Sequence, residues 1–214
     1  MNISLMNSFL LITVLINMYV MGSNRIISAI RAIAFQGVLL VLLAFLSKET
    51  NNTEALLFSI IIVIKGFVMP YLLIRVVRKV SIDQEMRPLI GYTPTLLIYG
   101  LCVIFSFYIA TTLPLLSEHK ESIIVPIFFA TLLGGMLLVI ARQKAVTHVI
   151  GYLIMENAVF ILSSMLTDSM TFLTEIGVLL DALAGVFIMG VVLNHIASIF
   201  DDEDSGKLLT MLKE

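Results

Sequence analysis

The sequence is poor in charge and almost lacks cysteine. Charged residues make up 13% of its 214 residues, and Cys102 is its single cysteine. One thiol cannot build a disulfide framework, a zinc site or an iron–sulfur cluster. Any redox chemistry in which the protein takes part must therefore take place on another chain. The net charge of −2 is too small to indicate a nucleic acid or an acidic substrate as partner.

Apolar residues are correspondingly abundant. They make up 59% of the chain, against about 45–50% in an ordinary soluble domain. The first apolar run begins without the basic residues that open a signal peptide, and it reaches Gly22 without an evident small-residue cleavage site. We therefore interpret this run as a permanent membrane helix.

Seven stretches are long and apolar enough to cross a bilayer, which takes about 20 residues of helix. They are expected at residues 3–21, 26–47, 55–78, 95–116, 122–141, 146–167 and 171–199. The predicted fold is all-α, a polytopic integral membrane bundle of about seven transmembrane helices. It forms a single transmembrane domain over residues 1–214, in which 200–214 is a short acidic cytoplasmic tail.

Lysine and arginine in the short loops predict the orientation. An outside N-terminus places nine of them in the cytoplasm and leaves only Lys48 and Lys120 outside. Because cytoplasmic loops carry the excess of basic residues, we expect an N-out/C-in, multi-pass protein of the cell inner membrane.

Three ionisable residues are expected near mid-helix: Lys65, Glu156 and Asp181. A charge at the bilayer centre costs at least ~2.5–3.5 kcal/mol, so each is a candidate for function. Gly177 and Gly185 share a helical face with Asp181, which favours a closely packed partner such as Lys65 or Glu156. Asp181 could serve ion movement or a structural ion pair.

Glu156 is the strongest candidate. His148, Tyr152 and Glu156 recur at i, i+4 and i+8 on one helical face, a stripe of about 12 Å at 1.5 Å per residue. Desolvation favours the neutral form of a buried carboxyl, so Glu156 could carry a proton arriving through His148 and Tyr152. The alternative is a neutral, hydrogen-bonded glutamate that only joins helices.

Lys65 is the second candidate. Gly66 and Pro70 follow it and are expected to loosen the helix and expose backbone groups beside the charge. Lys65 could take part in ion conduction or be a structural counter-ion.

Weaker candidates complete the predicted proton pathway. Arg31 and Gln36 could line the same route, although Arg31 could instead reach the cytoplasmic interface, and His195 lies near a helix end. We identify no nucleophile–base pair, phosphate loop or metal cluster. The chain is therefore expected to have no catalytic residue, cofactor or metal of its own.

Two resemblances join these residues to a family. The segment Gly151–Phe160 resembles the central helix of the small K subunit of respiratory complex I and its antiporter relatives, and 122–199 would be the corresponding three-helix segment. With Arg31–Gln36 and Lys65–Pro70, the whole chain resembles component E of hydrogenase-4 and formate hydrogenlyase-type complexes.

The resemblance implies a non-catalytic membrane-arm subunit of an oxidoreductase complex. Its partners would be antiporter-like membrane subunits and a hydrophilic arm that carries the nickel–iron and iron–sulfur centres. Electron transfer in that arm would be coupled to proton or sodium movement, with Glu156 in the place of the K-type intramembrane glutamate.

Three other functions are open to this sequence. A cation/proton antiporter component is one, although paired discontinuous helices are not evident. A receptor or retinal protein is another, but the central lysine lies in the third helix and the chain has no tryptophan. A purely structural scaffold subunit is the third, because buried charges also hold helices together.

Overall fold

The computed structural model describes residues 3–47, 52–79, 89–113 and 123–166, together with Gly185 and Gly190. Regular structure in these ranges is helical throughout, as the sequence predicts. Along the chain lie α1 (Ile3–Gly22), α2 (Ile26–Ser47), α3 (Asn52–Val63), the π-helical turn η1 (Ile64–Val68), α4 (Met69–Lys79), α5 (Tyr92–Thr112), α6 (Ile124–Ala141) and α7 (Ala145–Leu166).

Five of these helices are long and apolar enough to cross a membrane, namely α1, α2, α5, α6 and α7. Each starts and ends within a few residues of its predicted stretch. The all-α fold, with several helices able to cross a membrane, is therefore confirmed for the described residues. The seventh predicted stretch, residues 171–199, lies outside the described residues apart from Gly185 and Gly190, and so does the predicted tail over 200–214.

The third predicted stretch is interrupted rather than uniform. The helix is continuous from α3 to α4 only through η1, where the N–H of Met69 donates to the carbonyl of Ile64, five residues earlier. A proline clashes with the carbonyl four residues before it, which for Pro70 is that of Gly66. The wider π turn accommodates this proline, and such turns are frequent at functional sites.

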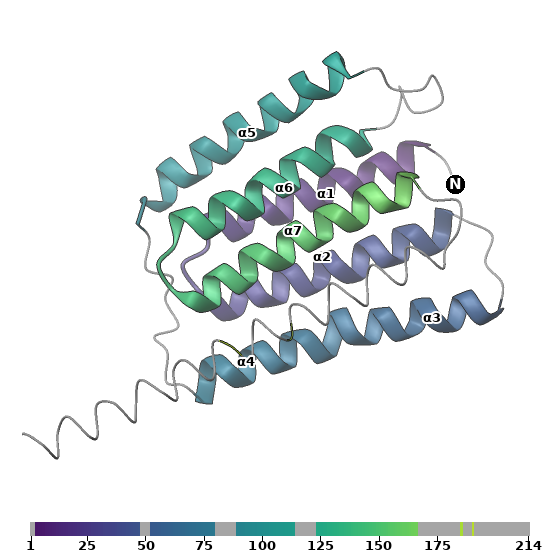
Figure 1. Ribbon diagram of the computed structural model, residues 1–214, viewed down its shortest axis with the longest axis horizontal. Helices are drawn as coiled ribbons and strands as arrows, with labels where there is room; N and C mark the ends of the chain where they lie inside the picture. Colours follow the sequence, from purple (N-terminus) through teal and green to yellow (C-terminus); the bar gives the residue numbers. More distant parts are fainter. Residues whose placement is uncertain are drawn as a thin grey trace, which may run out of the picture.

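Four helices form the centre of the bundle. In Figure 1, α1, α2, α6 and α7 lie together, α5 covers one side, and α3 and α4 follow one another along α2 on the opposite side. In the spans themselves, 72% of α7 is buried but only 17% of α5. Helix α7 is therefore the interior helix, and α5 presents apolar side chains such as Leu97, Leu101 and Ile104 outward.

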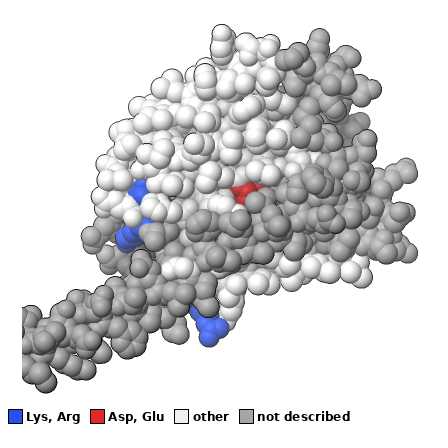
Figure 2. Space-filling model, in the orientation of Figure 1, with Lys and Arg blue, Asp and Glu red and all other residues white. Residues whose placement is uncertain are grey.

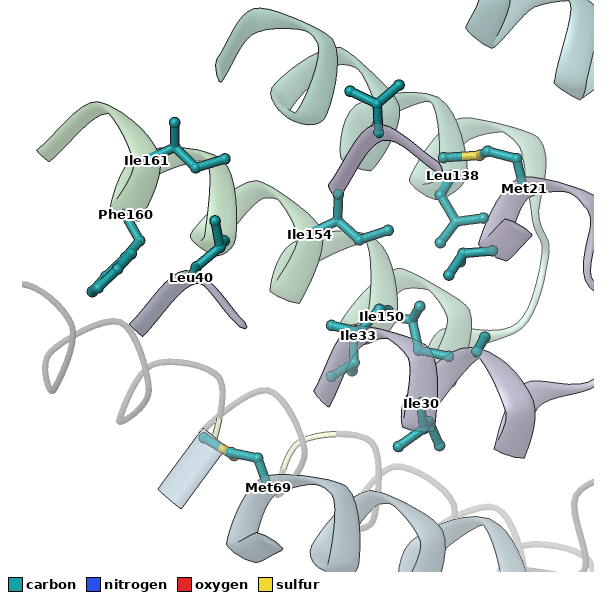
Figure 3. Packing of buried hydrophobic residues seen from close by; sticks show 14 of the residues in the cluster. Met21, Ile30, Ile33, Leu40, Met69, Leu138, Ile150, Ile154, Phe160 and Ile161 are labelled. Carbon is teal, nitrogen blue, oxygen red and sulfur yellow. The ribbon is translucent and has the colours of Figure 1, made fainter. Parts of the chain in front are cut away.

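The interior of the bundle is packed with branched aliphatic side chains. Figure 3 shows Ile150 and Ile154 of α7 beside Leu138 of α6 and Ile33 of α2. Helices α6 and α7 approach most closely at two glycines, because a Cβ atom on Gly151 would lie only 2.8 Å from the carbonyl oxygen of Gly135. These two helices make the most extensive contact in the described bundle.

Hydrogen bonds near the loops show which helix ends lie at the same end of the bundle. The guanidinium of Arg142, just after α6, donates to the carbonyl of Met21 near the end of α1 at 2.8 Å. The N–H of Leu89, just before α5, donates to the carbonyl of Ala141 at 2.9 Å. Helices α1 and α6 therefore end, and α2, α5 and α7 begin, at one end of the bundle.

Candidate functional site: a buried lysine–glutamate pair

The structure brings together two residues that the sequence singles out separately. Nζ of Lys65, in η1, lies 2.5 Å from Oε1 of Glu156, near the middle of α7. The lysine side chain is 6% exposed and the glutamate side chain 1%. The ammonium also lies 5.4 Å from the centre of the Phe160 ring, within the range of a cation–π interaction. This is an ion pair enclosed in an apolar bundle.

Helix α2 leaves room for the lysine stem. Gly37 faces the pair, and a Cβ atom built on it would lie 3.4 Å from Cδ of Lys65 and 3.7 Å from Oδ1 of Asn157. A Cβ atom on Gly66, inside η1, would lie 2.8 Å from Val38. Two glycines thus allow α2 and the π turn to approach each other and carry the lysine toward α7.

A small cavity adjoins the pair. It offers about 20 Å³ of room for water beside Lys65, Glu156 and Asn157, which suffices for about one molecule. Its remaining lining is largely apolar and comprises Ile30, Ile33, Ala34, Gly37, Met69, Pro70, Leu73 and Leu153. Oε2 of Glu156 and Nδ2 of Asn157 are buried without a hydrogen-bond partner among the described residues. Water between these groups could relay a proton to or from the carboxyl.

The predicted stripe on α7 runs from the surface inward. His148 is exposed, and its Nε2 donates to the carbonyl of Arg142 at 2.9 Å. Tyr152 is half-buried, and Glu156 is buried. All three lie on α7, but the hydrogen bond of His148 directs its ring toward the α6–α7 loop.

The two candidate residues on α2, Gln36 and Arg31, lie in different environments. Gln36 is fully buried in the bundle, and neither atom of its amide has a hydrogen-bond partner within the described ranges. Arg31 is exposed and lines an open groove between α1 and α2. The structure therefore does not bring Arg31 to the ion pair. Asp181 and His195 lie outside the described residues.

Arg142 is a buried charge and one of the nine basic residues that the predicted orientation places in cytoplasmic loops. It is 1% exposed, and its guanidinium carbon lies 4.4 Å from the centre of the Tyr92 ring. Burial lowers the pKa of Arg142, and the nearby Tyr92 opposes this shift. Arginine nevertheless stays protonated in proteins, so Arg142 is a permanent charge that joins α1, α5 and α6.

The burial of Arg142 could not be recognised from the local sequence. The positive-inside rule counts basic loop residues without distinguishing buried from solvated ones. Its stacking partner, Tyr92, stands fifty positions away in the numbering, at the start of another helix.

The described residues contain no group of three or more His, Cys, Asp or Glu side chains that could hold a metal ion. The chemistry available at the Lys65–Glu156 pair is proton transfer between an amine, a carboxyl and water. The apolar surroundings make separated charges costly.

Comparison with known proteins finds a full-length relative. The chain is 27% identical over 198 residues to the uncharacterized protein Rv0085 of Mycobacterium tuberculosis, a match that covers 91% of this chain and 90% of the relative. No protein-family model matches the chain. No solved structure matches it either.

Proposed function

We propose that this protein is a membrane-arm subunit of a hydrogenase- or complex I-like energy-converting assembly, in which the Lys65–Glu156 pair takes part in proton translocation. The observation that carries the proposal is the 2.5 Å contact between two buried ionisable groups from the π turn and α7. Intramembrane charges of this kind mark proton relays and ion pathways.

The pair has two states with the same net charge of zero. With the proton on Lys65 it is an ammonium–carboxylate pair, and with the proton on Glu156 it is a neutral amine and carboxylic acid. Lysine changes its charge state readily when buried. A small change in separation would alter the balance between these states, and the arm that transfers electrons could drive such a change.

The lining of the cavity indicates the side of the bundle from which protons would reach the pair. It includes Ile30 of α2 and Leu73 of α4, which lie toward the end of the bundle where α2 begins and α4 ends. Figure 2 shows lysine and arginine at this end of the face in view. In the proposed N-out/C-in arrangement of seven spans this end is cytoplasmic, so the pair would take protons from the cytoplasm of the cell.

The geometry favours the proton over sodium as the transported ion. The ammonium of Lys65 occupies the position beside Oε1 that a metal cation would take. Hard cations such as Ca²⁺ and Mg²⁺ are bound by about six or more oxygen ligands, whereas this site presents one carboxylate beside an amide and a lysine.

A purely structural role is the competing function. It is favoured by a second buried charge among the described residues, Arg142, which donates to the carbonyl of Met21 and lies over the Tyr92 ring. These contacts need no transport to explain them. In this alternative Lys65–Glu156 would only hold η1 against α7.

Affinity purification of the tagged chain in mild detergent, followed by mass spectrometry, tests the proposal. We expect antiporter-like membrane subunits together with a nickel–iron, iron–sulfur arm. A chain that purifies alone, folded and stable, would contradict the subunit assignment. Proton transport by that isolated chain in liposomes would then establish the antiporter function instead.

A further inference from the structure

A groove on the outer face of the bundle combines one charge with a long apolar wall. It lies between α1 and α2, has an open volume of about 540 Å³, and contains Arg31, Ser28 and Tyr19. Its apolar wall includes Ile12, Leu15 and Phe35. Leu15 is 63% exposed, Phe35 59% and Tyr19 56%, so the groove faces away from the bundle and is distinct from the Lys65–Glu156 site.

Polar and apolar residues are ordered by depth along this groove. Arg31 stands five residues after the start of α2 at Ile26, about 7.5 Å along the helix axis. Tyr19 stands three residues before the end of α1 at Gly22. Leu15 and Ile12 of α1 and Phe35 of α2 lie progressively deeper in their helices. This order is that of a phospholipid, with a polar head group at the interface and acyl chains below it.

The charge of Arg31 has no compensation from the described chain. Arg31 forms no ion pair with another described residue. Arginine binds phosphate through two parallel hydrogen bonds, and tyrosine is enriched at the membrane interface. Basic pockets between membrane helices bind anionic head groups.

We infer that the α1–α2 groove is a binding site for an anionic phospholipid, with the phosphate on Arg31 and an acyl chain along Leu15, Ile12 and Phe35. Ser28 and Tyr19 supply hydroxyl groups beside the phosphate. The site requires only that α1 and α2 lie in a membrane, and it is independent of proton transfer at Lys65–Glu156.

Native mass spectrometry of the full chain in detergent tests the inference, with phosphatidylglycerol or phosphatidylcholine added at equal concentration. We expect preferential retention of phosphatidylglycerol. Arg31→Gln should reduce that preference about five-fold, since one basic residue near a charged lipid surface contributes about that much to binding. Arg31→Lys should retain part of it.

Two further variants separate the groove from general effects. Arg25→Gln removes an exposed charge at the same end of the bundle, outside the groove, and should leave the preference unchanged. Leu15→Trp fills the apolar wall at an exposed position and should reduce retention of phosphatidylglycerol without lowering thermal stability.

Equal retention of the two lipids, or an unchanged preference in Arg31→Gln, would overturn the inference. A photocrosslinker at Phe35 in native membranes gives a second test. Crosslinking to phospholipid would support the site, and crosslinking to a neighbouring protein subunit would contradict it.

Discussion

Lys65 and Glu156 are 91 residues apart in the sequence, yet their side chains meet at 2.5 Å in the interior of the bundle. The lysine comes from a π turn and the glutamate from the most buried helix. The contact therefore joins α7 to the α3–α4 segment, on the far side of α2.

Removal of one partner of this pair should destabilise the protein more than removal of both. Glu156→Gln leaves a buried ammonium without its counter-charge, and breaking a buried pair in this way costs about 3–5 kcal/mol. Combination of Lys65→Met with Glu156→Gln should recover most of that loss. Thermal unfolding in detergent of the two single variants and the double variant measures the coupling, and strictly additive effects would show that the two charges do not interact.

The close approach of α6 and α7 predicts that Gly→Ala substitutions at different glycines will differ sharply in their effect on stability. In Gly151→Ala the new methyl would lie 2.7 Å from Val139 and 2.8 Å from the carbonyl oxygen of Gly135. Overpacking of this kind costs about 1–3 kcal/mol, and the melting temperature should fall.

Gly100 on α5 is the matched control. Nothing lies within 4 Å of a Cβ atom at this position, so Gly100→Ala should be neutral or stabilise by up to about 1 kcal/mol through its helix propensity. Equal effects at Gly151 and Gly100 would mean that α6 and α7 do not pack as the structure has them.

The arrangement of helix ends predicts which loops share a side of the membrane. In a Cys102→Ala background, Asn24→Cys and Gln143→Cys should react with an impermeant thiol reagent from the cytoplasmic side, because both positions are exposed in loops at the same end. Leu113→Cys, just after α5, should react only from the opposite side. Labelling of Asn24→Cys and Leu113→Cys from the same side would refute a membrane-spanning α3–α4 segment.

Much of this fold could be predicted from sequence, because the length and apolarity of a membrane helix are local properties. The limits of α2 match the prediction at both ends, and those of α7 differ by one residue at each end. The proline and glycine beside Lys65 predict a loosened helix, and a π turn is found there.

The partners across helices could not be predicted, because helical periodicity does not define how each helix is rotated in the bundle. Arg31 and Gln36 are five residues apart, about 140° around the helix, and only Gln36 is buried. The sequence could identify Lys65 as one possible partner of Asp181. The contact with Glu156 depends on how α2, η1 and α7 pack around Gly37.

The proposed function depends most directly on whether Glu156 moves protons. The decisive measurement compares proton uptake by membrane vesicles with electron transfer by the same assembly, in wild type and Glu156→Gln. We predict that protons translocated per electron fall steeply in the Glu156→Gln complexes that assemble, because a positioned proton-transfer group contributes about 10²–10⁴-fold to the rate of proton transfer, while hydrogen turnover by those complexes persists. Ser106→Ala, a buried hydroxyl on α5 that donates to the Cys102 carbonyl, serves as control and should behave as wild type. Unchanged proton translocation per electron in the assembled Glu156→Gln complex would contradict the proposed function and leave the pair a structural role.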